Sequence, residues 1–78
     1  MKWYKEASEK KWKRVDSTFI KAVSYDKDLH TLSVRLKGGV VYNFKDVTKD
    51  IYKDLIRSQS KGKFFNKSLK DQYEWNKE

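Results

Sequence analysis

The residues of this chain that could do chemistry are aromatic rings and lysines in two short segments. In the first, Tyr42-Asn43-Phe44, aromatic residues alternate, and in the second, residues 60–66, lysines and phenylalanines surround one glycine. Proteins that stack single-stranded nucleic acid combine aromatic faces with nearby cations. The rings of Tyr42 and Phe44 are also in phase with Val40, however, which favours the core face of a strand over a stacking platform. The lysines are therefore the stronger candidates for a binding role.

Four lysines lie close to Gly62 in the sequence, namely Lys61, Lys63, Lys67 and Lys70. If Gly62 turns the chain into a helix, the free backbone N–H groups at the helix start form an anion site together with these lysines. The alternative is a turn between two helices in which the lysines are only solvated and Ser60 and Asn66 are capping residues. Both interpretations stay open on the sequence alone.

No residue pattern typical of a catalytic or metal site accompanies these segments. His30 is the single histidine and lies in a predicted loop, and the chain has no cysteine. Asp26 and Asp28 lack the glycine and distal glutamate of a calcium loop, so turn formation explains both aspartates. Gly38-Gly39 lacks the lysine and hydroxyl residue of a phosphate-binding loop and predicts a hairpin turn instead. We therefore expect no enzymatic activity, catalytic residue, metal, cofactor or small-molecule substrate.

The charge of the chain favours polyanionic partners. Among its 78 residues, 19 Lys and Arg outnumber 11 Asp and Glu, which gives a formal net charge of +8. Half of this excess lies in residues 1–14, which hold six bases and two acids. Binding of such a chain to nucleic acid releases counterions from the phosphates, although the same charge also serves solubility alone. No apolar run is long enough for a membrane span, and we expect a cytoplasmic protein without a membrane partner.

Three predicted strands must position these residues. Residues 18–25, 31–37 and 40–45 are rich in β-branched and aromatic residues or alternate with a period of two. They predict a three-stranded antiparallel meander in which Gly38-Gly39 forms the second turn. The sheet face that points away from the core is expected to show Arg35, Lys37, Asn43 and Lys45.

Two short helices are expected to follow the strands and to pack on one face of the sheet. The first begins after Thr48, a suitable N-cap, and ends before Gly62, where a left-handed glycine is expected. The second covers Phe64 to about Tyr73, where apolar residues recur every four positions. The chain is thus predicted to be an α+β protein with a single domain over residues 15–76 and a basic N-terminal extension over residues 1–14.

Residues 17–73 resemble the KTSC domain, a module named for its occurrence at the C-terminus of some lysyl-tRNA synthetases, which also occurs alone in small bacterial and phage proteins. The resemblance lies in the order of several motifs: Ser17 and Ile20, Ser24-Tyr25-Asp26, Leu32-x-Val34-x-Leu36, Gly39, Tyr42-Asn43-Phe44, Val47, Tyr52, Leu55, Ser60-x-Gly62-x-Phe64-Phe65-Asn66, Leu69 and Tyr73. Phe44 stands where the family typically has a second tyrosine, and Thr48 where it often has proline. By analogy with the tRNA enzyme, the resemblance implies binding of nucleic acid, especially RNA.

The main hypothesis is a non-catalytic module whose basic surface binds nucleic acid, RNA in preference to DNA, or else an acidic protein. Its predicted binding residues are Lys10, Lys11, Lys13, Arg14, Arg35, Lys37, Lys45, Lys61, Lys63, Lys67 and Lys70. The alternative is a protein-interaction adaptor, for example a phage accessory protein, anchored by Trp3, Tyr4, Trp12 and Trp75. A small hydrolase or nuclease is the weakest hypothesis, because it needs clustered acids or a partner for His30.

Overall fold

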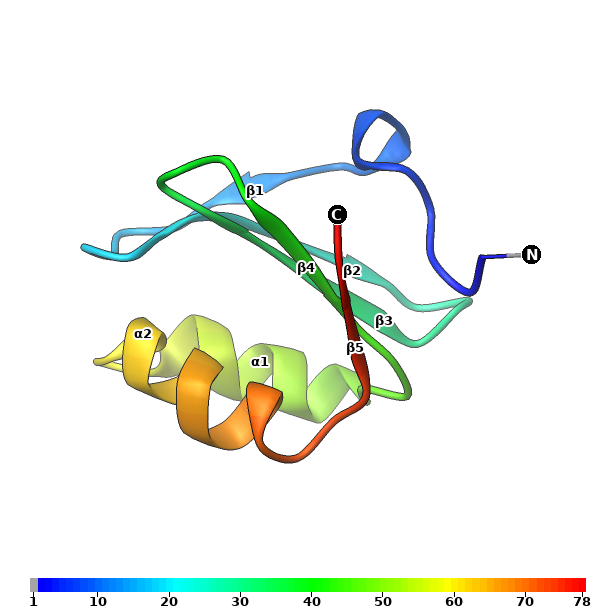
Figure 1. Ribbon diagram of the computed structural model, residues 1–78. Helices are drawn as coiled ribbons and strands as arrows, with labels where there is room; N and C mark the ends of the chain where they lie inside the picture. The colour runs from blue at the N-terminus through cyan, green and yellow to red at the C-terminus, as the bar shows by residue number, and fades with distance from the viewer. Residues whose placement is uncertain (1) are drawn as a thin grey trace.

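The computed structural model describes residues 2–78 and shows one antiparallel sheet with helices packed on one of its faces (Figure 1). The five strands are neighbours in the sheet in the same order as in the sequence: β1 (Lys13–Arg14), β2 (Ile20–Asp26), β3 (Thr31–Leu36), β4 (Val41–Phe44) and β5 (Trp75–Lys77). The predicted α+β class is confirmed, whereas the predicted number of three strands is too small. The two additional strands lie at the sheet edges and have two and three residues, too few for alternation to reveal them.

The three central strands form the predicted meander. Val34 in β3 pairs with Val23 in β2 and with Tyr42 in β4, so these three side chains share one face of the sheet. The connection between β3 and β4 is longer than the predicted two-residue turn, because the ladder ends at Leu36 and resumes at Val41. Within this connection Gly39 has a φ of 98°, a conformation that glycine adopts without steric cost.

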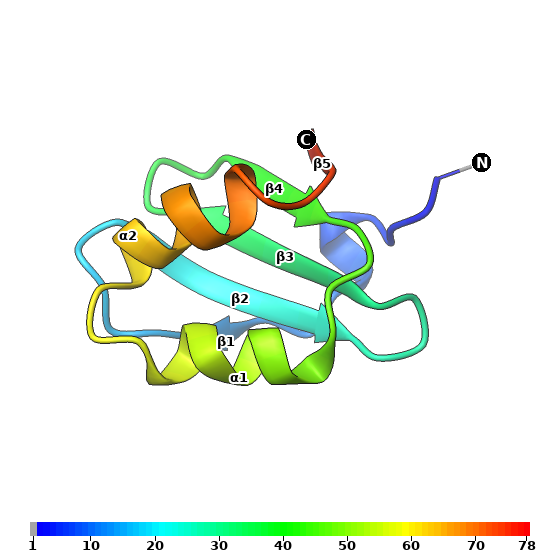
Figure 2. The same cartoon turned by 90° about the horizontal axis from the view of Figure 1, so that it is seen from below.

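Two helical stretches cover one face of the sheet, as predicted. The helix α1 (Lys49–Arg57) is followed by α2 (Lys61–Phe64), which continues directly into the π-helical segment η2 (Phe65–Lys70). Figure 2 shows α1 lying along the β1–β2 side of the sheet and η2 over the β3–β4 side, while α2 lies at the end of the sheet where β2 begins. Thr48 is the N-cap residue of α1, but its hydroxyl makes no capping hydrogen bond.

Gly62 has a different role from the predicted one. It does not end the first helix in a left-handed conformation, because α1 has already ended at Arg57 and Gly62 lies within α2. A β-carbon on Gly62 would lie 3.3 Å from the β-carbon of Phe19. The absence of a side chain therefore allows the close approach of α2 to the segment before β2.

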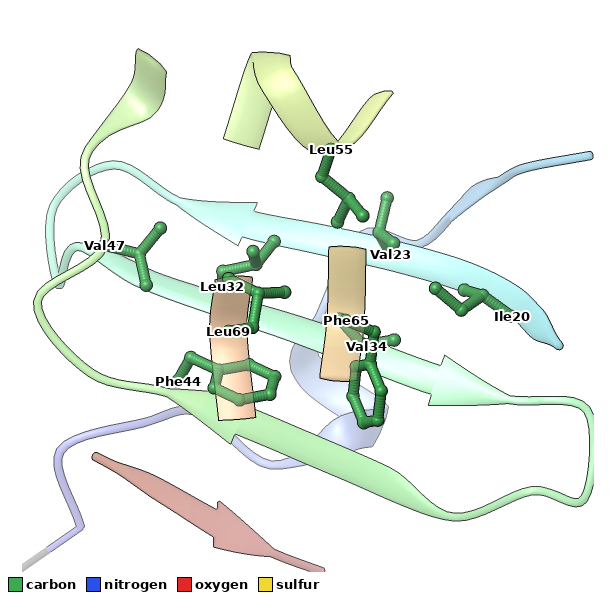
Figure 3. Close-up of a cluster of buried hydrophobic side chains, with 9 residues drawn as sticks. All are labelled: Ile20, Val23, Leu32, Val34, Phe44, Val47, Leu55, Phe65 and Leu69. Atoms are coloured by element: carbon green, nitrogen blue, oxygen red, sulfur yellow. The ribbon is translucent and has the colours of Figure 1, made fainter. Parts of the chain in front are cut away.

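Nine buried apolar side chains fill the space between the sheet and the helices (Figure 3). They are Ile20, Val23, Leu32, Val34, Phe44, Val47, Leu55, Phe65 and Leu69. A register shift between Ile20 and Ala22 lets Ile20 and Val23 face the same side although they are three residues apart. Phe44 is fully buried in this cluster, which confirms the core interpretation of its ring.

The opposite face of the sheet is covered by residues 2–12, which we call the arm and which contain the 3₁₀ helix η1 (Ala7–Glu9). Figure 1 shows η1 and the helices on opposite sides of the sheet. We call these two faces the arm side and the helix side. The predicted boundary between the N-terminal extension and the domain, after residue 14, falls directly after β1. In β1, Lys13 pairs with Val23 and Arg14 pairs with Ala22 of β2. The arm is therefore joined to the sheet through β1.

Candidate nucleic-acid interface

The predicted binding residues do not form a single patch, because the sheet lies between them. Lys61, Lys63, Lys67 and Lys70 lie on α2 and η2, on the helix side. Lys10, Arg35 and Lys45 lie on the arm side, where each contacts an aromatic ring of the arm. The remaining four are exposed near β1 and in the β3–β4 connection, namely Lys11, Lys13, Arg14 and Lys37.

A continuous row of aromatic rings crosses the helix side from the segment before β2 to β5. The centre of the Phe65 ring lies 5.6 Å from that of Phe19 and 5.1 Å from that of Tyr42, and the centres of the Tyr42 and Trp75 rings are 5.2 Å apart. We call these four residues the aromatic row. Phe65 is 1% exposed, whereas Phe19 and Trp75 at the two ends are each 39% exposed. The row therefore begins and ends in solvent and passes through the core.

Lys70 adds a positive charge to this row. Its ammonium nitrogen lies 5.2 Å from the centre of the Tyr42 ring, 5.1 Å from that of Trp75 and 6.0 Å from that of Phe65. These distances are in the range of cation–π attraction. A partly open aromatic face and a cation thus occupy the same place, a combination that proteins use to bind single-stranded nucleic acid.

The other lysines of α2 and η2 differ in whether their ammonium groups are free to bind an anion. Lys63 and Lys67 are exposed and lie four residues apart on the same stretch. Lys61 instead donates a hydrogen bond from its ammonium group to the Ser58 carbonyl oxygen at 2.9 Å, where α1 leaves backbone carbonyls without helical partners. Lys63, Lys67 and Lys70 therefore remain as candidate ligands for an anion, whereas Lys61 has a structural partner.

Two residues of β5, Trp75 and Lys77, lie beside the aromatic row and the helix-side lysines, although the sequence does not predict them as nucleic-acid-binding residues. Trp75 is predicted from the sequence as an anchor for a protein, and no role is predicted for Lys77. Trp75 pairs with Phe44 and Lys77 pairs with Tyr42 across β4 and β5, which directs both side chains to the helix side. The alternation Trp75-x-Lys77 is the available signal, and it is too short to predict a strand.

The arm side of the sheet is polar and covered, although we expected this face to show Arg35, Lys37, Asn43 and Lys45. Ser24, Ser33, Asn43 and Asn76 are paired in register from β2 to β5, and we call them the polar row. Ser33 Oγ donates a hydrogen bond to Asn43 Oδ1 at 2.5 Å, and Asn43 Nδ2 donates one to Glu78 Oε1 at 2.8 Å. The prediction that Asn43 is exposed is therefore wrong, because its side chain is fully buried beneath these partners.

The arm also stacks against the cations of this face. The guanidinium carbon of Arg35 lies 4.4 Å from the centre of the Trp12 ring, and Lys45 Nζ lies 5.9 Å from that of Trp3. Trp12 is itself fixed by a hydrogen bond from its Nε1 to the Ala7 carbonyl oxygen at 3.1 Å. Both tryptophans therefore pack on the body of the protein, and the face that we expected to show Arg35 and Lys45 is covered by the arm.

Lys10 is enclosed between the arm and the C-terminal residue. Its side chain is 6% exposed, and its ammonium nitrogen lies 3.7 Å from Glu78 Oε1 and donates a hydrogen bond to the Lys5 carbonyl oxygen. Burial lowers the pKa of Lys10 below its ordinary value, although Glu78 acts in the opposite direction. The predicted role of Lys10 on an open basic surface is therefore wrong, because its ammonium group joins the arm to Glu78.

The turn between β2 and β3 confirms the structural interpretation of Asp26 and His30. Asp26 Oδ1 accepts hydrogen bonds from the backbone N–H groups of Asp28 and Leu29 at 3.0 and 3.1 Å. His30 is exposed in the same turn, with a φ of 53°. Within residues 2–78, no three His, Cys, Asp or Glu side chains are grouped so that they could hold a metal ion. In the same residues, no helix has the length and apolar character needed to cross a membrane.

Comparison with known proteins relates most of the chain to one family. The KTSC domain model matches residues 16–73. A protein of Tsukamurella paurometabola is 32% identical over 59 residues, which cover 76% of this chain and 88% of that protein. The crystal structure of a KTSC domain protein from Yersinia pestis matches with a TM-score of 0.79 and 25% identity, covering 87% of this chain and 96% of that one.

Two longer relatives contain a similar segment. The lysine–tRNA ligases of Nostoc punctiforme and of Nostoc sp. are 32% and 30% identical over 60 residues, which cover 77% of this chain but 11% of each ligase. The family match at residues 16–73 contains β2, β3, β4 and the helices, whereas the arm, β1 and β5 lie outside it. The matched part therefore includes the whole apolar core and every ring of the aromatic row except Trp75.

Proposed function

The chain belongs to the KTSC domain family, and we propose that it is a non-catalytic module that binds single-stranded nucleic acid, with RNA preferred over DNA. The observation that carries this proposal is the position of the Lys70 ammonium group, 5.2 Å from the Tyr42 ring and 5.1 Å from the Trp75 ring. Trp75 is 39% exposed at this point. Lys63, Lys67 and Lys77 are exposed on the neighbouring segments and extend the positive charge.

In the proposed complex, a base stacks on the open part of Trp75 while phosphates lie along Lys63 and Lys67. One base stacked on an aromatic side chain contributes about 1–3 kcal/mol and is tolerant of sequence, because every base has a π face. The lysine contacts release counterions, so the affinity falls as the salt concentration rises. We therefore expect salt-sensitive binding with weak sequence preference.

The preference for RNA is supported by the names of two relatives. Both Nostoc relatives are lysine–tRNA ligases, and the segment similar to this chain makes up 11% of each. This support is an analogy with a larger protein. A direct comparison of RNA with DNA of the same sequence tests it, because the 2′-hydroxyl group is what distinguishes the two.

A fluorescence anisotropy titration tests the proposal, with labelled single-stranded RNA, the same DNA and an RNA duplex, at about 50 and about 200 mM salt. K63Q/K67Q should weaken binding to every strand and lower the salt slope by about 1 for each phosphate that the variant no longer binds. W75L keeps an apolar side chain but removes the ring, and should weaken binding about tenfold without a change in salt slope. W75F should restore most of the affinity.

K49Q/K53Q is the matched control, because it removes two exposed lysines from α1. Equal losses in K49Q/K53Q and K63Q/K67Q would show a diffuse charge effect and contradict the proposed surface. No binding to any strand at the lower salt concentration would contradict the function itself and favour the adaptor alternative. Of the four anchors of that alternative, Trp75 is 39% exposed, whereas Trp3, Tyr4 and Trp12 are half-buried.

A further inference from the structure

A polar cavity of about 320 Å³ lies between the arm and the β2–β3 turn. It forms because β1 pairs with β2 only at Ala22 and Val23, so the chain before Lys13 leaves the edge of β2 and folds back through η1. Its volume is at the lower end of the range of small-ligand sites. The cavity lies on the opposite side of the sheet from the aromatic row.

Most of the acidic groups at this cavity already have partners. Asp26 Oδ2 lies 3.1 Å from Lys5 Nζ, and its other oxygen accepts two backbone N–H groups of the turn. The Glu9 carboxylate accepts a hydrogen bond from the backbone N–H of Glu6 at 3.3 Å. Of the three carboxylates that line the cavity, Asp28 is the one without such a partner within residues 2–78.

The cationic and hydroxyl groups at the cavity are in excess of these acids. Lys11 and Lys27 line it and form no ion pair within residues 2–78. The side chain of Lys10 lines it as well and is 6% exposed. Ser24 also lines the cavity and is 8% exposed, and its hydroxyl makes no hydrogen bond within the same residues. The cavity therefore brings together two ammonium groups and one hydroxyl group that have no partner within residues 2–78, and these donors are available to an anionic ligand.

We propose that this cavity binds a phosphate monoester. A phosphate group offers three strong acceptor oxygens, which match the ammonium groups of Lys11 and Lys27 and the hydroxyl donor of Ser24. Asp28 then remains as the acceptor for a hydroxyl group on the alcohol part of the ester. The ligand class is therefore a phosphorylated and hydroxylated compound of the size of a sugar phosphate.

Two sources could supply this chemistry, a free sugar phosphate or the 5′-phosphate at the end of a nucleic-acid strand. The cavity shares no residue with the aromatic row or with the helix-side lysines. The cavity can therefore bind a phosphate even if the helix side binds no nucleic acid, and the reverse also holds. The experiment has to monitor residues of both sites.

Amide chemical shifts of the full chain during titration with ribose 5-phosphate test this site, with ribose as the probe that lacks the phosphate. We expect saturable shifts at Lys11, Ser24 and Lys27 with ribose 5-phosphate and none with ribose. K11Q/K27Q should lower the affinity about tenfold or more, and S24A should lower it about fivefold. K49Q/K53Q is again the control and should leave the affinity unchanged. The spectrum of each variant also reports whether it is folded.

A short RNA with a 5′-phosphate, compared with the same RNA with a 5′-hydroxyl, separates the two sources. Shifts at the cavity with only the phosphorylated strand identify a strand end, and saturable shifts with ribose 5-phosphate alone identify a metabolite. Shifts that do not saturate with any phosphorylated probe, or that are equally large in K11Q/K27Q, overturn the site. Loss of RNA binding in the aromatic-row variants leaves these shifts intact, so failure of one proposal is distinguishable from failure of the other.

Discussion

The two faces of the sheet bury their side chains by different means. On the helix side, nine apolar side chains pack against one another with almost no exposed surface. On the arm side, Ser24, Ser33 and Asn43 of the polar row are buried instead. The stacked guanidinium group of Arg35 and a hydrogen bond from Thr31 Oγ1 to the Trp3 carbonyl oxygen join the sheet to the arm. Burial of one large apolar side chain contributes roughly 1.5–3 kcal/mol, whereas one hydrogen bond contributes about 1 kcal/mol net. Most of the free energy of unfolding should therefore come from the helix side.

The comparison indicates what polar burial does on the arm side. Ser33 and Asn43 are fully buried, so a shifted register of β3 and β4 or a displaced Glu78 would leave their polar atoms without partners. The cost of such unsatisfied groups opposes a shift of β3 against β4. The polar row therefore favours one register of the central strands and one position of Glu78, while the helix side supplies most of the stability.

The largest expected effect is on the helix side, at Phe65. The Phe65→Ala change removes a ring that is 1% exposed and that contacts the rings of Phe19, Tyr42 and Phe44. It should lower the free energy of unfolding by about 3–5 kcal/mol, which is much of the total for a small domain. Urea denaturation followed by circular dichroism measures this. Phe65→Leu is the control, and a cost for F65A below that of the arm-side changes would contradict the comparison.

An intermediate effect is expected on the arm side, at Asn43. The Asn43→Ala change removes two hydrogen bonds and leaves the buried hydroxyl of Ser33 without its acceptor, so the cost should be about 2–3 kcal/mol. The variants N43A, S33A and S33A/N43A, each measured by urea denaturation, form a double-mutant cycle. We expect S33A to cost about 1 kcal/mol less when Asn43 is already absent. Additive costs would show that the polar row is not a connected unit.

A smaller effect is expected within the arm, at Trp12. The Trp12→Ala change removes the stack on Arg35 and the hydrogen bond to the Ala7 carbonyl oxygen. The expected cost is about 1–2 kcal/mol, because the site is partly exposed and the cation–π part contributes about 1 kcal/mol. Trp12→Phe keeps a ring for the guanidinium group, so its midpoint of thermal unfolding should lie between those of W12A and the unchanged protein. Equal midpoints for W12A and W12F would show that the stack does not contribute to stability.

The smallest effect concerns Asp26, and it depends on pH. Burial acts to raise the carboxyl pKa, but the N–H groups of Leu29 and Asp28 and the Lys5 ammonium group together hold the pKa of Asp26 below its ordinary value. A carboxyl group with a lowered folded-state pKa stabilises the fold above its unfolded pKa, near 4, and loses this contribution as the pH falls through the folded value.

Asp26→Asn should therefore cost up to about 1 kcal/mol at pH 7 and nearly nothing at a pH below the folded value. Urea denaturation at pH 7 and at about pH 2 measures the difference between the two proteins. A cost that is the same at both values would show that the carboxylate charge is not involved.

The helix side is the part of the molecule that could be predicted from the sequence. The alternation of Leu32 and Val34 predicts β3, and the phase of Tyr42 and Phe44 predicts the core face of β4. Both predictions succeed because burial against one layer of helices leaves a period of two in a short stretch of sequence. Gly62 is the exception, since its closeness to Phe19 depends on residues far away in the chain.

The arm side could not be predicted in the same way. Asn43 looks like a surface residue, because its burial depends on Glu78 and on the arm, which lie far from it in the sequence. The arm itself is rich in charge and has no regular period, so its contacts with Arg35 and Lys45 have no local signal. For the same reason, the eleven predicted cations could be named from composition but could not be divided between two opposite faces.

The order of the strands also has a consequence for how the chain folds. β1 to β4 each pair with the strand next to them in the chain, so these pairings close short loops and should form early. β5 must pair later, because α1, α2 and η2 all lie between β4 and β5. Its amide hydrogens should therefore exchange with solvent faster than those of β3. The proposed nucleic-acid surface is then completed by the last strand to fold, and a bound strand of RNA should slow hydrogen exchange in β5 more than in any other strand.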